Sequence, residues 1–217
     1  MDAVRWKIKD TLDFSVDEAV LDVYEFPEDA LRGKPAMTNV VAARKTLIAE
    51  LIAMVKSSEL YLQSIDVTEL ALRNLVEPLA EEGQATALVL MRETTGMMLL
   101  VKDGMVYFSR RLHADMQALT VDDQKDRIGQ QLALEVQRSM DYFESQMGQK
   151  APRTILVSSA VNEAELFTHL GDILGVDITA IPENRLGVSE DLVAGANVFV
   201  ACGGALRKRT GFPLVAA

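Results

Sequence analysis

The order of the hydrophobic segments in the second half of the chain is the feature that most constrains its fold. Three short apolar runs follow one another closely, at residues 85–92, 96–101 and 106–111. The last two are separated by Asp103-Gly104, a pair typical of tight hairpins because glycine adopts a positive φ at little cost. This region therefore predicts three antiparallel strands.

A long helix is predicted next, because residues 121–146 carry apolar side chains at steps of three and four, and Gly148 follows as a stop signal. Shorter strands and helices then alternate, at 154–158, 163–174, 176–179 and 191–207. Three antiparallel strands followed by alternating helices and strands describe a ribonuclease-H-like fold, the half-unit of actin-like proteins. We therefore expect the α/β class with mixed sheets.

The first part of the chain predicts a smaller set of elements. Val4, Ile8 and Leu12 recur at helical spacing, which predicts a short amphipathic helix at the N-terminus. Further elements are expected as strands at 19–26, 37–43 and 61–67, and as helices at 44–57 and 68–76, the last with Thr68 as N-cap. The acidic segment 77–83 is the expected boundary, giving two domains at 1–76 and 77–217.

Composition excludes several classes of function. The 217 residues carry a net charge of −10, which would repel a phosphate backbone and argues against nucleic-acid binding. The single cysteine, Cys202, excludes an intramolecular disulfide, and with only two histidines no zinc cluster is expected. These features are typical of a protein from the reducing cytoplasm.

No membrane-spanning segment is expected. The longest uncharged stretch near the C-terminus, 192–206, is fifteen residues long and contains three glycines. A helix that spans a bilayer needs about 20 apolar residues. The N-terminus has no apolar run typical of a signal peptide, so any association with a membrane is expected to occur through a partner.

Five segments carry a resemblance to a known family. Residues 2–9 (DAVRWKIK), 12–22 (LDFSVDEAVLD), 65–73 (IDVTELALR), 134–146 (LEVQRSMDYFESQ) and 201–207 (ACGGALR) resemble corresponding segments of PilM, the actin-like protein of type IV pilus machines. Within this family the chain is most similar to the MshI branch, which serves mannose-sensitive haemagglutinin (MSHA) pili. The cytoplasmic domain of GspL is a more distant relative.

The resemblance implies the domain assignment in more detail. Residues 1–34 correspond to a subdomain inserted in the first actin-like half, residues 37–76 to a strand-helix-strand remainder of that half, and residues 77–217 to the second half. Actin-like proteins open with a strand, a phosphate-binding hairpin and a second strand. Because Met1 stands directly before the inserted subdomain, we expect this first phosphate loop to be missing here, through truncation, an internal start or an incomplete sequence.

The resemblance also locates a nucleotide site, which departs from the family's pattern. ATP-binding relatives have Asp-x-Gly after the first strand of the second half, whereas this chain has Met91 and Arg92 there. The residues corresponding to the site are Glu93, Thr94, Thr95, Gly96, Ser158 and Ser159. We expect this site to be degenerate, with no catalytic residue, no metal ligand and no cofactor beyond residual ATP and magnesium.

The expected function follows from the family. The resemblance implies a cytoplasmic scaffold at the inner membrane, which binds the cytoplasmic tail of a PilN-like or MshJ-like bitopic protein and contacts the pilus assembly ATPase. We expect Trp6, Ile8 and Leu12 to bind the tail, because Trp6 lies off the apolar line of its helix and exposed aromatics are enriched at binding hot spots. Ordinary packing of Trp6 remains an equal alternative.

Other functions remain open at this stage. A working actin-like ATPase would need the missing Asp-x-Gly, and a GspL-like secretion component would be expected to continue into a transmembrane helix. A carbohydrate kinase of the same superfamily is a more distant alternative. Arg110 and Arg111 are interpreted as exposed cations of an edge strand, which oppose aggregation, and His113 as a surface residue.

Overall fold

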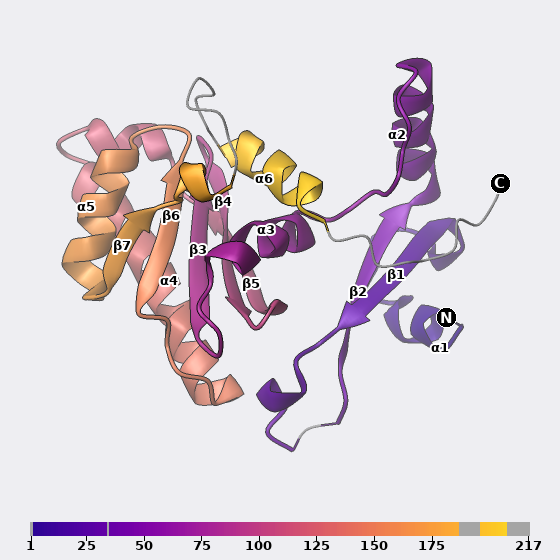
Figure 1. Ribbon diagram of the computed structural model, residues 1–217, viewed down its shortest axis with the longest axis horizontal. Coiled ribbons are helices and arrows are strands. Elements are labelled where there is room, and N and C mark those ends of the chain that lie inside the picture. Colours follow the sequence, from indigo (N-terminus) through magenta and orange to yellow (C-terminus); the bar gives the residue numbers. More distant parts are fainter. Residues whose placement is uncertain (1, 34, 187–195, 208–217) are drawn as a thin grey trace. The chain divides into compact units, whose positions relative to one another are not determined.

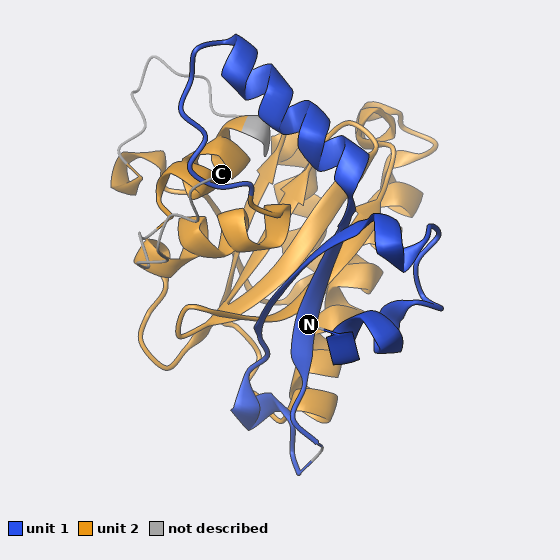
Figure 2. Cartoon of the chain, turned by 90° about the vertical axis from the view of Figure 1, so that its right-hand side faces the viewer, with its two compact units in different colours: residues 1–65 blue, residues 66–217 orange. Residues whose placement is uncertain are grey.

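The chain forms two compact units in the computed structural model, which describes residues 2–33, 35–186 and 196–207. Unit 1 comprises residues 1–65 and unit 2 comprises residues 66–217 (Figure 2). The helix at 68–76 groups with unit 2, whereas the sequence prediction assigned it to the first domain.

Unit 2 is built on a five-stranded mixed sheet (Figure 1). The strands are β3 (Ala85–Met91), β4 (Thr95–Lys102), β5 (Met105–His113), β6 (Thr154–Ser159) and β7 (Asp177–Ala180), in the spatial order β5-β4-β3-β6-β7. The first three strands pair antiparallel, and β6 and β7 are added in parallel to β3. This is the ribonuclease-H-like order expected from the sequence.

Two pairs of helices cover this sheet. Helices α4 (Lys125–Met147) and α5 (Glu163–Leu174) pack together against one face, and α3 (Thr68–Val76) packs on α6 (Ala196–Ala205). Figure 1 shows the α3 and α6 pair on the opposite side of the sheet from α4. The core is apolar and fully buried, with Leu72 and Leu75 on α3, Leu88 and Leu99 in the sheet, and Phe143 on α4.

Local signals in unit 2 act as the sequence predicts. Asp103 and Gly104 form the β4–β5 hairpin with φ of 49° and 71°. Gly148 ends α4 in the left-handed conformation, and its N–H donates to the carbonyl of Glu144. The helix begins at Lys125 rather than at 121, and part of the predicted helix 191–207 lies outside the described residues.

Unit 1 contains a two-stranded antiparallel ribbon and two helices. These are α1 (Asp2–Ile8), β1 (Ala19–Glu25), β2 (Thr38–Arg44) and α2 (Lys45–Ser57). The N-terminal helix is shorter than predicted, because Thr11 closes a turn: its N–H and its hydroxyl both donate to the carbonyl of Ile8. Leu12 therefore lies beyond the helix.

The strand predicted at 61–67 is not formed. These residues have no regular secondary structure, and β1 and β2 pair only with each other. The apolar residues Leu60, Tyr61 and Ile65 are exposed instead. An apolar run becomes a strand only when another strand accepts its backbone hydrogen bonds, and the described part of unit 1 provides none here.

None of the described helices combines the length and the apolar character that a bilayer-spanning segment requires.

Candidate functional site

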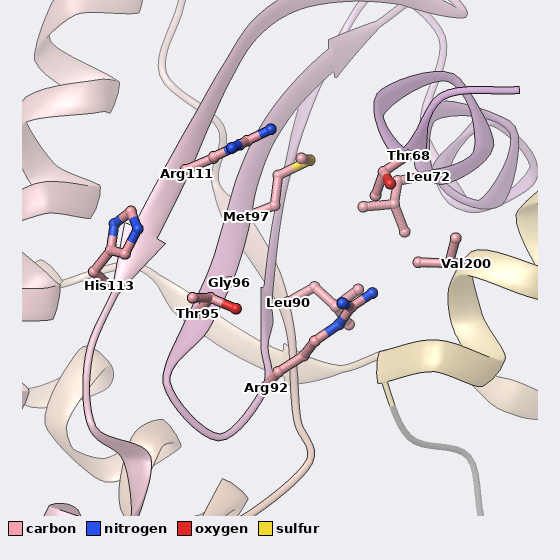
Figure 3. Close-up of a pocket in the computed structure, with 10 residues that line it drawn as sticks. All are labelled: Thr68, Leu72, Leu90, Arg92, Thr95, Gly96, Met97, Arg111, His113 and Val200. Atoms are coloured by element: carbon pink, nitrogen blue, oxygen red, sulfur yellow. The ribbon is translucent and has the colours of Figure 1, made fainter. Parts of the chain in front are cut away.

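A cavity of about 270 Å³ in unit 2 is the candidate site (Figure 3). It is bounded by the C-terminal end of β3, by β4 and β5, and by the two helices α3 and α6. Its lining residues are Thr68, Leu72, Leu90, Arg92, Thr95, Gly96, Met97, Arg111, His113 and Val200. The site therefore combines two guanidinium groups, an imidazole ring and two hydroxyl groups with an apolar surface.

The β3–β4 turn supplies one wall of the cavity. The Arg92 N–H donates to the Thr95 carbonyl at 2.7 Å, which closes a turn over residues 92–95. Of the hairpin residues predicted from the sequence, Thr95 and Gly96 line the cavity, whereas Glu93 and Thr94 are exposed in the turn and do not. The backbone carbonyls of Glu93 and Thr94 accept hydrogen bonds from the segment after β5 at 2.8 and 3.2 Å, which fixes the turn.

Gly96 is required by the packing of the hairpin itself. It lies opposite Met91 in the β3–β4 ladder. A Cβ atom at this position would collide with the Met91 sulfur and with the Leu90 carbonyl oxygen. The glycine thus has a structural reason that involves no phosphate group.

Ser158 and Ser159 lie at the end of β6, next to the end of β3, and do not line the cavity. Both side chains are buried. The Ser159 N–H donates to the carboxylate of Glu163 at 2.9 Å, and the Ser159 hydroxyl donates to the Val161 carbonyl. A backbone donor at the position predicted to contact a nucleotide is therefore already engaged within the chain.

Two neighbouring arginines of β5 point to opposite faces of the sheet. β5 is an edge strand, as the interpretation of Arg110 and Arg111 requires. The Arg110 guanidinium lies 5.4 Å from the Phe108 ring and donates to the Glu135 carbonyl of α4 at 3.4 Å. Arg111 lines the cavity on the other face. The two side chains consequently have different surroundings and can be tested separately.

The strand register brings the basic side chains of the cavity together. Arg111 lies opposite Met97 and His113 lies opposite Thr95 in the β4–β5 ladder, so both basic side chains share a face with cavity residues of β4. Arg92 reaches the same cavity from the end of β3, and Figure 3 shows Arg92 and Arg111 extending toward α3 and α6 with Met97 between them. The sequence analysis missed this group, although the spacing of Arg111 and His113 is a strand-face signal.

The cations of the cavity have no acidic partner among the described residues. Arg44, Lys125 and Arg207 form ion pairs elsewhere in the described chain. No aspartate or glutamate is among the lining residues. In the described part of the chain, no group of three or more His, Cys, Asp or Glu side chains is placed to hold a metal ion.

The N-terminus of α3 adds a further positive feature. Thr68, expected as the N-cap, is the first helical residue, and the cap is Val67, which has no side-chain acceptor. The first N–H groups of an α-helix have no partner within the helix, and together they carry a partial positive charge. Because Thr68 lines the cavity, this end of α3 lies at its wall.

The residues predicted to bind a partner lie in unit 1. Trp6 on α1 is 71% exposed, and the Lys9 ammonium lies 5.8 Å from its ring. Ile8 and Leu12 are half-buried, so Trp6 is the most accessible of the three. Arg5 attaches the helix to the following turn, since its guanidinium donates to the Val16 carbonyl at 2.7 Å.

Comparison with solved structures identifies the fold. The chain is similar to a structure of the PilM–PilN type IV pilus biogenesis complex, with a TM-score of 0.67 and 20% identity over 94% of this chain and 70% of that chain. It also matches the cytoplasmic domain of EpsL, an inner-membrane component of the type II secretion system of Vibrio cholerae (TM-score 0.49, 7% identity, 95% and 64% covered). A Bacteroides thetaiotaomicron protein with an actin-like ATPase fold matches at a TM-score of 0.45 and 9% identity, with 82% and 60% covered.

No family model matches the chain, and no curated protein matches it by sequence. The likeness to the PilM–PilN structure and the strand order of unit 2 agree with each other. The chain has an actin-like fold, as the sequence predicted.

Proposed function

We propose that this chain is an actin-like scaffold of type IV pilus biogenesis, of the MSHA type, which binds the cytoplasmic tail of a PilN-like or MshJ-like inner-membrane protein. The observation that carries the proposal is the likeness to the PilM–PilN complex, which extends over 94% of this chain. In this role the protein is cytoplasmic, reaches the inner membrane through its partner, and couples the assembly ATPase to the membrane platform.

The surface around Trp6 is the proposed docking site for the tail. A tryptophan that is 71% exposed leaves a large apolar area in water, and such residues are enriched among those that dominate binding energy. The hydrogen bond from Arg5 to Val16 holds the helix that carries it. Asp10, Asp13 and Asp17 are exposed in the same unit, so a tail with basic residues is favoured.

The nucleotide site is proposed to be degenerate. Arg92 stands where the family's metal-positioning aspartate is expected, and Glu93 is exposed in the turn outside the cavity. Ser158 and Ser159 form the second segment predicted to contact a nucleotide. The Ser159 N–H already donates to Glu163, so this donor is engaged within the chain. Calorimetric titration of Mg-ATP tests this point: we expect no saturable binding, and stoichiometric binding at micromolar affinity would favour a working ATPase.

Tail binding is tested with a fluorescently labelled peptide that corresponds to the N-terminal tail of the bitopic pilus protein from the same organism. We expect saturable binding by fluorescence anisotropy, and we expect Trp6→Ala to weaken it by about tenfold or more, as for a hot-spot residue. Tyr61→Ala is the matched control, because Tyr61 is an aromatic residue of the same unit with 73% exposure.

Two results would contradict the proposal at different levels. Equal binding by the wild-type chain and by Trp6→Ala would remove the docking site from α1 but leave the pilus function. Absence of tail binding by a folded wild-type chain would contradict the scaffold function itself. Circular dichroism of each variant establishes that the chain is folded.

A further inference from the structure

The basic character of the unit 2 cavity is unusual for this chain. The protein has 32 acidic and 22 basic residues, yet the cavity lining includes Arg92, Arg111 and His113 and no acidic residue. In the described chain these three side chains form no ion pair. The guanidinium groups of Arg92 and Arg111 face one cavity and repel one another, and an anion bound between them relieves that repulsion.

All three basic side chains are exposed, so an anion can reach them from solvent. Leu72 and Leu90 are buried, Met97 and Val200 are half-buried, and all four contribute apolar surface to the cavity. These apolar groups offer a contact surface for an apolar part of a ligand. The N-terminus of α3, at Thr68, adds backbone N–H groups and a partial positive charge, which is an arrangement that binds anions.

The number and type of donors indicate which anion fits. A carboxylate has one negative charge and two oxygens, and a single arginine can bind both oxygens. A phosphate monoester carries up to two charges and three terminal oxygens, which matches two guanidinium groups assisted by the Thr68 and Thr95 hydroxyls. The apolar wall then fits the group to which the phosphate is attached.

We propose that this cavity binds a small phosphate monoester with an apolar body, and that it does so without a metal ion. Magnesium prefers oxygen ligands, chiefly carboxylates and phosphates, and the cavity lining contains no carboxylate. The guanidinium groups of Arg92 and Arg111 take the place of the metal in balancing the phosphate charge. With a volume of about 270 Å³, the cavity lies at the small end of ligand pockets, which favours a compact ligand.

This proposal is independent of tail binding. Its residues belong to unit 2, whereas the proposed docking residue Trp6 belongs to unit 1. A chain that binds the tail peptide but no phosphate ester would retain the proposed function and lose only the present inference. A chain that binds a phosphate ester but not the tail peptide would retain this inference and contradict the proposed function.

Isothermal titration of phenyl phosphate into the full chain, in the presence of EDTA, tests the proposal directly. We expect one site, with tighter binding than inorganic phosphate because the phenyl ring contacts the apolar wall. Arg92→Gln and Arg111→Gln should each weaken binding by about tenfold or more, as expected for a charge-assisted hydrogen bond. Arg110→Gln is the matched control and should leave affinity within about twofold, because Arg110 is the next residue of the same strand and faces α4.

A second measurement tests where phenyl phosphate binds. In a chain with ¹³C-labelled methionine methyl groups, phenyl phosphate should shift the Met97 signal and leave that of Met37 unchanged, because Met97 lines the cavity and Met37 lies in unit 1.

Three results would overturn the proposal. They are no titration of the wild-type chain at millimolar phenyl phosphate, an equal loss of affinity in Arg110→Gln and Arg111→Gln, and a nuclear magnetic resonance response to Mg-ATP but none to phenyl phosphate.

Discussion

The two units of this chain are stabilised in different ways. Unit 2 has a large buried apolar core, whereas the buried residues among those described in unit 1 are Ala19, Pro27, Ala30 and Leu31. Helix α2 has no buried residue at all. Unit 1 is held instead by its backbone ladder and by polar contacts, so the two units should respond differently to the same kind of substitution.

Removal of a core side chain gives the largest expected difference. Phe143 is fully buried on α4 and its ring meets Tyr107 edge to face at 5.6 Å. Phe143→Ala should lower the free energy of unfolding by about 3–5 kcal/mol. The matched change in unit 1 is Met54→Ala on α2, where the side chain is 59% exposed, and its effect should stay within about 0.5 kcal/mol. Urea unfolding followed by circular dichroism measures the free energy of unfolding of both variants. Equal losses would contradict the expected difference between the two units.

A medium effect is expected where α3 and α6 meet. Gly203 is buried, and a Cβ atom on it would collide with the Ala71 carbonyl of α3. The Gly203 carbonyl also accepts a hydrogen bond from the buried Asn74 amide at 3.1 Å. Gly203→Ala should therefore destabilise unit 2 by about 1–3 kcal/mol.

Gly204→Ala is the control for this change, since nothing lies within 4 Å of the position of its Cβ. Alanine is the better helix former, so this variant should be neutral or up to about 1 kcal/mol more stable. A thermal melt in which both variants lose stability equally would show that α6 rejects alanine for a reason other than contact with α3.

The smallest effect is expected for a polar cluster of unit 1. Arg44 lies 4.2 Å from the Phe14 ring, 3.6 Å from Asp13 and 3.9 Å from Glu18. Arg44, Asp13 and Glu18 are exposed, so Arg44→Gln should cost about 1 kcal/mol or less. Added salt should reduce this cost, because salt screens exposed charges. Denaturant melts at low and high salt measure the difference, and a cost that exceeds that of Gly203→Ala would contradict the ranking.

Sequence reasoning succeeded where elements carry strong local signals. The hairpin at Asp103-Gly104, the long amphipathic helix and its end at Gly148 are set by residues close in the chain. The alternation of strands and helices then restricts the topology, because parallel strands require a crossover between them. These local rules predict the sheet order that unit 2 has.

It failed where an element needs a distant partner. Residues 61–67 have an apolar pattern but no strand to pair with, and periodicity does not reveal a missing partner. The cavity was missed for a related reason. Arg92 and Arg111 come together through the pairing of three strands, and a register shift at Leu100/Val101 makes that pairing hard to count from the sequence.

The contact between α3 and α6 also bears on how the protein emerges from the ribosome. α3 is the first helix of unit 2 and α6 its last described element, and they pack directly against each other. The contact between Ala71 and Gly203 can therefore form only after residues 196–205 have left the ribosome. Until then this face of α3 is uncovered, and a chaperone can bind it.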